Sequence, residues 1–181
     1  VRPSTGTTQQ INRILARPGA GTAVATVVHE ATHQIAFNCI PHIDDFDDEG
    51  NTREERKMID ETRKILELPS LGVSVTCVRV PVFRSHAVAL NVQTERVVSP
   101  EEAREVMGAF AGVRILDDPQ TAAYPTQMDA EGGDDVWVGR VRADESLENT
   151  LSMWVVADNL RKGAALNAVQ IAELLLDELA G

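Results

Sequence analysis

Hydrophobic positions recur with helical spacing in residues 53–67. Met58, Ile59, Ile65 and Leu66 share one face of a helix, and charged residues occupy most of the remaining positions. This pattern predicts an amphipathic helix. Two further helices are predicted later in the chain: one is capped by Ser99 and runs to about Gly112, and a long closing helix spans 161–179.

Strand patterns lie between these helices. In 87–94, Val88, Leu90 and Val92 alternate with other residues and fall on one face. Interleaved strands and helices predict an α+β or α/β-like fold, a mixed β-sheet with helices on one face. The predicted strands are 73–80, 87–94, 113–116, 136–142 and 151–157.

Length and composition narrow the class of protein. The 181 residues suffice for one well-packed domain, and no apolar run approaches the roughly 20 residues of a membrane-spanning helix. A formal charge of −11 argues against nucleic acid as the main partner. Cys39 and Cys77 form no disulfide framework, and no signal-peptide pattern opens the chain, so we expect a cytoplasmic protein.

The charge is unevenly distributed. Residues 1–34 hold three arginines and one glutamate, a net charge of +2, which leaves 14 basic and 27 acidic residues in 35–181, a net charge of −13. We therefore predict a boundary near residue 34, with a head of uncertain structure before it and one domain after it.

The head contains a metal-binding pattern. His29, Glu30 and His33 fit HExxH, in which two imidazoles on one helix face bind Zn²⁺ and the glutamate activates water. Residues 22–37 resemble the active-site helix of a zincin metallopeptidase. The extended metzincin pattern fails, because Ala36 stands at its glycine and Cys39 at its third histidine. A zinc hydrolase is thus an alternative function, and two ordinary histidines are the structural alternative.

Four residues farther along could serve a different chemistry. Glu54 and Lys57 are helix neighbours that could meet an amino group and a phosphate, and Arg79 ends a strand pattern where a guanidinium can bind a carboxylate. His86 can move a proton near neutral pH. Each also has a structural alternative: a solvated ion pair for the first three residues, and a satisfied structural histidine for the last.

Four segments in order resemble the C-terminal, dimerisation and substrate-binding domain of the aspartate-semialdehyde dehydrogenase family. The resemblance covers residues 34–181 and implies a domain like the C-terminal one of glyceraldehyde-3-phosphate dehydrogenase. The segments that carry it are QIAFNCIPHID at 34–44, EERKM at 54–58 with ETRKI at 61–65, RVPVFRSH at 79–86 and DNLRKGAALN at 158–167.

The resemblance also implies roles for individual residues. Glu54 would bind the amino group of aspartate semialdehyde, Lys57 the phosphate and Arg79 the α-carboxylate, while His86 would be the general acid/base. Asn159 would contact NADP. The implied reaction is the NADP-dependent reductive dephosphorylation of aspartyl phosphate, in lysine, threonine and methionine biosynthesis, by a homodimer formed through the sheet.

Two features of that family have no match in the sequence. Gly19-Ala20-Gly21 follows no strand and is not a dinucleotide fingerprint, and we expect Cys39 and Cys77 to be small buried hydrophobic residues rather than the nucleophile. We therefore expect a catalytically incomplete chain, and hypothesise a truncated or fused gene product joined near residues 34–38. A non-catalytic dimerisation or binding module is the second alternative.

The closing helix carries an apolar stripe that would lack a cover. In the family the helix returns to pack on the nucleotide-binding domain, so we expect exposed apolar side chains along it. They are Val169, Leu174, Leu175 and Leu179.

Overall fold

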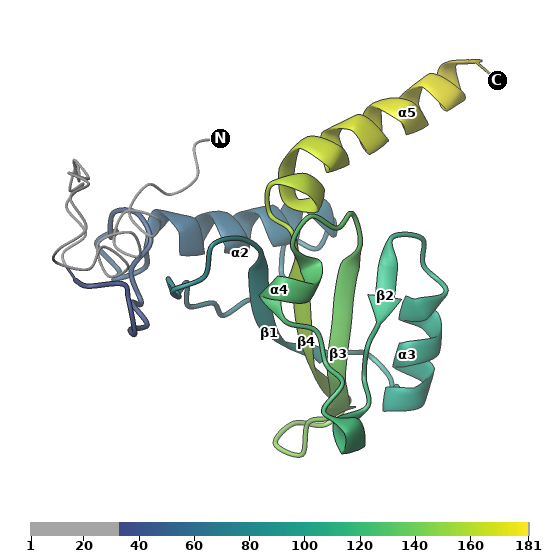
Figure 1. Cartoon of the computed structure of the whole chain (residues 1–181), viewed down its shortest axis with the longest axis horizontal. Coiled ribbons are helices and arrows are strands. Elements are labelled where there is room, and N and C mark those ends of the chain that lie inside the picture. Colours follow the sequence, from purple (N-terminus) through teal and green to yellow (C-terminus); the bar gives the residue numbers. More distant parts are fainter. Residues whose placement is uncertain (1–32, 181) are drawn as a thin grey trace, which may run out of the picture. The chain divides into compact units, whose positions relative to one another are not determined.

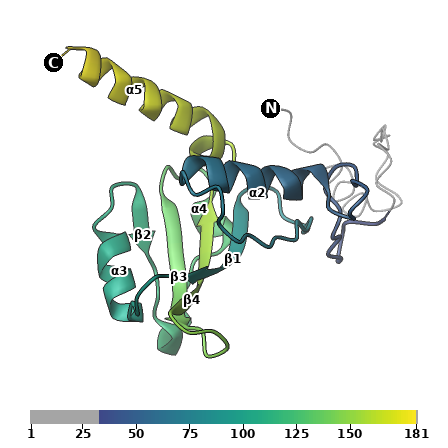
Figure 2. The same cartoon turned by 180° about the vertical axis from the view of Figure 1, so that it is seen from behind.

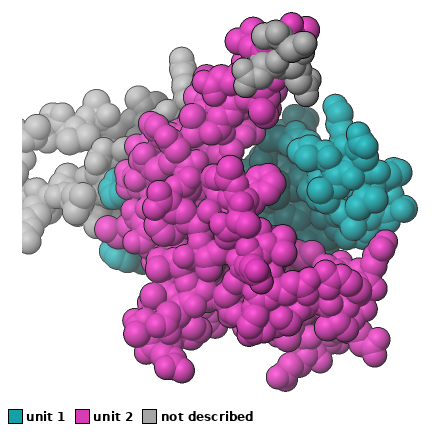
Figure 3. Space-filling view, turned by 90° about the vertical axis from the view of Figure 1, so that its right-hand side faces the viewer, with its two compact units in different colours: residues 1–83 teal, residues 84–181 magenta. Residues whose placement is uncertain are grey.

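The computed structural model describes residues 33–180 (Figure 1). The chain divides into two compact units, the first ending at Phe83 and the second beginning at Arg84 (Figure 3). The predicted boundary near residue 34 falls at the edge of the described residues and stays a prediction.

The first unit is organised around helix α2, Arg53–Ile65. Thr52 caps it in a capping box with Glu55, and acidic residues in the first turn and basic residues in the last favour the helix dipole. The amphipathic helix predicted for 53–67 is confirmed, with Leu66 as its C-cap.

The strand predicted for 73–80 is wrong. Burial does alternate along 71–79, as in an extended chain, but the segment has only one isolated bridge, between Ile40 and Arg79. Their backbones exchange hydrogen bonds of 3.0 and 2.8 Å. Pro41 and Pro81 lie close to the two ends of this bridge and have no N–H to extend a ladder, so the pairing stops after one residue.

The second unit contains a mixed four-stranded sheet in the order β1-β4-β3-β2. Strands β1 and β3 pair antiparallel with β4, whereas β2 pairs parallel with β3. The α+β fold class is confirmed, together with the four strand predictions in this unit. The strands are β1 His86–Gln93, β2 Val113–Ile115, β3 Val136–Ala143 and β4 Thr150–Ala157.

Helix α3, Pro100–Gly108, packs on this sheet. Figure 2 shows α3 beside β2, and the core joins Ala103 of the helix to Val138, Leu151 and Met153 of the strands. The helix ends at Gly108, four residues earlier than predicted, with Ala109 as its C-cap. Gly112 takes a φ of 81° in the turn that leads into β2.

Short helices and one long helix complete the second unit. Turn η1, Pro119–Thr121, and helix α4, Gln127–Ala130, lie between β2 and β3. The predicted closing helix begins as a π-helix, η2 Arg161–Ala165, and continues as α5, Leu166–Ala180. Its apolar stripe is exposed as expected, and no helix of the described residues is long and apolar enough to span a membrane.

Candidate functional site

Glu54 and Lys57 lie in the first turns of α2. Lys57 Nζ and Glu54 Oε1 are 3.4 Å apart, and both side chains are partly open to solvent. An exposed pair of this kind adds little stability, so both groups can exchange their partner for a ligand at small cost.

The residue between them, Glu55, is buried and ties the helix to the segment that carries Arg79. Its Oε2 accepts a hydrogen bond from the Thr52 backbone at 2.7 Å, and its Oε1 accepts one from the Cys77 backbone at 2.8 Å. The N–H of Thr52, followed by that of Cys77, lowers the pKa of Glu55 below its ordinary value. Sequence reasoning missed this role, although the spacing of Thr52 and Glu55 is a capping-box signal.

Arg79 is half-buried in the extended segment, and its backbone is held by Ile40. Within the described part of the chain, no carboxylate forms an ion pair with it, so the surface ion pair considered as its structural role is not seen there. A guanidinium placed in this way can bind a carboxylate through two parallel hydrogen bonds.

The two cysteines lie in different environments. Cys77 is half-buried, and burial raises the pKa of its thiol, with the charge of Glu55 as the next cause. It therefore stays protonated and is a poor nucleophile. Cys39, however, is exposed, and the expectation of a buried residue was wrong. Phe37 and Asn38, which precede it, are exposed as well, and the next buried residue is Ile40.

In the second unit, His86 opens β1 and pairs in register with Ala157, the last residue of β4. Ser85, just before it, is buried with a φ of 70°, and its N–H donates to Asn159 Oδ1 at 2.9 Å. A serine in the left-handed region is strained, and it keeps this conformation only where the surrounding structure holds it. The Asn159 amide thus fixes the backbone that presents His86.

Asp158, beside Asn159, is fully buried. Its carboxylate accepts hydrogen bonds from Gly132 N at 2.8 Å and Leu160 N at 2.9 Å, and lies 3.1 Å from Arg84. Burial acts to raise the pKa of Asp158, but these two N–H groups and the Arg84 charge outweigh it, and the pKa is lowered. This carboxylate holds the turn that carries Asn159, a role that sequence reasoning did not assign.

The structure tests little of the HExxH motif. His29 and Glu30 lie outside the described residues. His33 is the first residue that the structure describes, and it is exposed in a bend. Across residues 33–180, no group of three or more His, Cys, Asp or Glu side chains could hold a metal ion.

The predicted site residues divide between the units. Glu54, Lys57 and Arg79 belong to the first, and Glu55 links the helix of the first two to the segment of the third. His86 and Asn159 belong to the second, where Ser85 joins them. Each group has a buried carboxylate directly beside a predicted residue, Glu55 in one and Asp158 in the other.

Comparison with known proteins gives consistent matches. Residues 16–162 match the family described as semialdehyde dehydrogenase, dimerisation domain. An aspartate-semialdehyde dehydrogenase of Aquifex aeolicus is 58% identical over 146 residues, which are 81% of this chain and 43% of the relative.

Solved structures agree. A Vibrio cholerae aspartate semialdehyde dehydrogenase II complexed with ASA matches with a TM-score of 0.81 and 45% identity, over 96% of this chain and 49% of that one. A Candida albicans aspartate semialdehyde dehydrogenase with NADP matches with a TM-score of 0.63 and 26% identity, over 78% of this chain and 45% of that one. The chain thus spans less than half the length of these proteins.

Proposed function

The chain belongs to the semialdehyde dehydrogenase family through its dimerisation domain, and from this premise we propose that it serves an aspartate-semialdehyde dehydrogenase. The observation that carries the proposal is the 58% identity over 146 residues to the Aquifex aeolicus enzyme. The family is one of oxidoreductases. The proposed reaction is the NADP-dependent reductive dephosphorylation of aspartyl phosphate to aspartate semialdehyde, in the cytoplasm.

In this proposal the first unit binds the polar ends of the substrate. Arg79 binds the α-carboxylate and Glu54 the amino group, so that one cation and one anion recognise an amino acid by charge. Lys57 binds phosphate as a compact, mobile charge. The hydrogen bond from Cys77 to Glu55 supports this assignment, because it limits the movement of the Arg79 segment relative to α2.

In the second unit, His86 is the proposed general acid/base. An imidazole can accept the proton of a thiol nucleophile and return it at neutral pH. Asn159 is the proposed NADP contact, and its geometry fits that role: Oδ1 is taken by Ser85 N, which leaves the amide N–H donors of this side chain for a polar cofactor atom. NADP itself supplies the hydride chemistry.

We also propose that the chain assembles as a homodimer. The description of the matching family as a dimerisation domain supports this. Sedimentation analysis over a range of concentrations would measure it, and a monomer at all concentrations would contradict it.

Phosphate-dependent reduction of NADP with aspartate semialdehyde tests the proposed activity. The assay compares the 181-residue chain with a chimera in which residues 34–181 replace the matching part of the Aquifex aeolicus relative. We expect turnover from the chimera and none from the chain alone, in which no dinucleotide fingerprint occurs. An inactive but folded chimera would contradict the proposal.

Substitution of Arg79 by Gln tests the substrate role. We expect kcat/KM of the chimera to fall by about 100-fold or more, because the variant loses the charge-assisted hydrogen bonds between Arg79 and the substrate carboxylate. Arg53→Gln is the matched control: this arginine is 71% exposed in a surface pair with Asp45, and its loss should leave kcat/KM nearly unchanged.

A further inference from the structure

Two adjacent contacts join the chain just before β1 to the chain just after β4. Ser85 N donates a hydrogen bond to Asn159 Oδ1 at 2.9 Å. Arg84 Nη2 lies 3.1 Å from Asp158 Oδ2. Two consecutive residues thus bind two consecutive residues, and we call these four the strand-end clamp. His86, which follows the clamp directly, begins the pairing of β1 with β4.

Ser85 does not hold its own backbone conformation. Its φ of 70° lies in the left-handed region, which glycine adopts at no steric cost and serine does not. The Ser85 hydroxyl is buried and has no hydrogen-bond partner among the described residues. The strained turn therefore depends on the bond to Asn159 and on the contacts of the neighbouring residues.

The ion pair of Arg84 is largely shielded from solvent. The Asp158 side chain is 0% exposed and that of Arg84 34%, so water and salt screen this pair less than a surface pair. Arg84 Nε is buried and has no hydrogen-bond partner in the part of the chain that the structure describes, and Glu131 lies farther from the guanidinium, at 3.9 Å. Asp158 is therefore the contact that fixes the direction of the Arg84 side chain.

Asp158 is itself fixed by backbone groups on both sides. The N–H groups of Gly132 and Leu160 orient its carboxylate. Its main-chain carbonyl accepts hydrogen bonds from Arg161 N and Gly163 N, both at 3.2 Å, at the start of η2. The partner of Arg84 thus belongs to a well-anchored turn, and Arg84 ties the start of β1 to it.

We propose that Arg84 and Asp158 are positioning residues for His86, the proposed general acid/base. Their ion pair holds the Ser85 backbone in its strained conformation, and this backbone presents the imidazole. The inference rests on the proposed function, in which neither residue touches the substrate. Proton transfer needs the imidazole within hydrogen-bond reach of the reacting group, so a small displacement lowers the rate. Arg79 belongs to the first unit and is no member of the clamp, so kcat should change more than the KM for aspartate semialdehyde.

Hydrogen exchange in the full 181-residue chain tests the clamp without any assay of activity. In Arg84→Gln the Ser85 amide should exchange about 10-fold faster or more, because the turn that holds its acceptor is no longer tied to β1. Arg84→Lys keeps a charge beside Asp158 and should give an intermediate rate. Arg96→Gln is the matched control: this exposed arginine pairs with Glu102, and its loss should leave the rate within about twofold.

Steady-state kinetics of the chimera with residues 34–181 test the role in the reaction. We expect Arg84→Gln to lower kcat by about 10-fold or more while the KM for aspartate semialdehyde stays within about twofold. Arg84→Lys should restore part of kcat. The Arg84→Gln/Asp158→Asn double variant should lose much less than the product of the two single losses, because the two residues act through one contact.

The outcomes separate this inference from the proposed function. An inactive unsubstituted chimera would contradict the proposed function, and the role of Arg84 in catalysis with it. With an active chimera, an unchanged Ser85 exchange rate, an unchanged kcat in Arg84→Gln or fully multiplicative losses in the double variant would overturn the positioning role alone. A higher KM at constant kcat would do the same, because Arg84 would then bind substrate. If a melting curve shows Arg84→Gln unfolded, Arg84→Lys and Asp158→Asn supply the same comparisons.

Discussion

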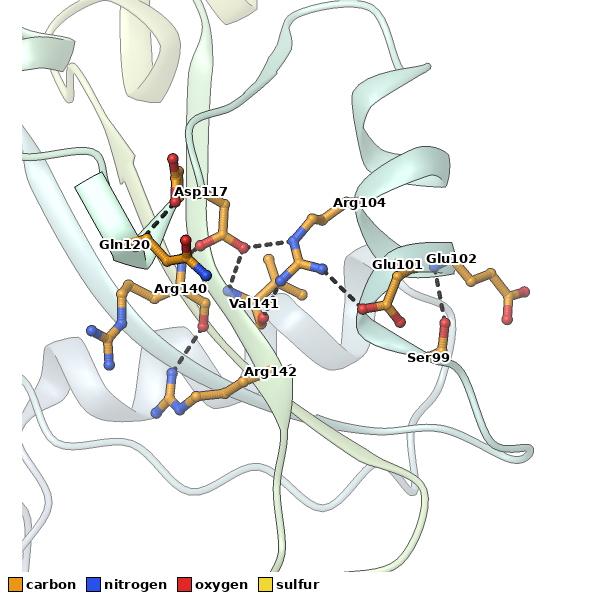
Figure 4. A network of polar contacts seen from close by, with 10 residues as sticks. Ser99, Glu101, Glu102, Arg104, Asp117, Gln120, Arg140, Val141 and Arg142 are labelled. Atoms are coloured by element: carbon orange, nitrogen blue, oxygen red, sulfur yellow. Dashed lines mark hydrogen bonds and ion pairs between the residues drawn. The ribbon is translucent and has the colours of Figure 1, made fainter. Parts of the chain in front are cut away.

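Asp117 Oδ2 accepts a hydrogen bond from Arg104 Nε at 2.7 Å, and only 1% of the Asp117 side chain is exposed. Arg104 belongs to α3, whereas the two backbone amides that the same carboxylate binds, those of Arg140 and Val141, belong to a bulge of β3 (Figure 4). At this bulge the pairing of β3 with β4 shifts, between Gly139 and Arg142. One carboxylate therefore connects the helix to the irregular part of the strand.

Replacing Asp117 by Ala should destabilise the second unit by roughly 2 to 4 kcal/mol, because two backbone amides and the partly exposed Arg104 side chain lose a buried acceptor. Urea unfolding measures the change. Asp135→Ala is the control: this residue pairs with the exposed Arg114, so its loss should cost less than about 1 kcal/mol. Similar losses in the two variants would show that the Asp117 contacts do not hold the bulge.

Replacing Gly139 by Ala should also destabilise the sheet. The new Cβ would lie 2.3 Å from the Leu116 carbonyl oxygen, and backbone must move to admit it. We expect a loss of about 1 to 3 kcal/mol or more, measured by thermal or urea unfolding. Gly72→Ala is the matched control, because no atom lies within 4 Å of a Cβ at that position. An unchanged Gly139→Ala protein would contradict the packing of Leu116 and Pro125 against β3.

Replacing Glu55 by Ala should loosen the segment before Arg79. The Cys77 amide loses its acceptor, and its hydrogen exchange should become faster than in the unchanged chain. Glu61→Ala, on the same helix, should leave that amide unaffected. If exchange of the Cys77 amide does not change in Glu55→Ala, the carboxylate does not position Arg79.

Acid unfolding should depend on Asp158. Its lowered pKa means that the folded state favours the ionised carboxylate. The resulting stabilisation is complete above the unfolded-state pKa of about 3.9 and is lost as pH falls through the lower folded-state value. Asp158→Asn should therefore be less stable than the unchanged chain at neutral pH, and its stability should fall less steeply below about pH 4. Parallel pH profiles for the two proteins would contradict this.

The sequence predictions succeeded where the deciding interactions are local along the chain and failed where they join distant segments. Helix α2 and the start of α3 were predicted because their periodicity and caps are local. The strand expected at 73–80 failed because a strand needs a partner, and alternation within one segment does not reveal that Pro41 and Pro81 limit the pairing. The exposure of Cys39 was missed for a related reason, since the burial of a residue between regular elements depends on what packs against it.

The sequence by itself determined the helices, the mixed sheet of the second unit and the family, because these rest on periodicity and on short motifs. Only the tertiary structure revealed the two buried carboxylates that hold the candidate residues, and the irregular part of β3 whose backbone Asp117 binds. Glu55 meets Cys77 across 22 positions, and Asp117 meets Val141 across 24. Contacts at such separations leave no periodic trace in the chain, since they exist only once the backbone has folded.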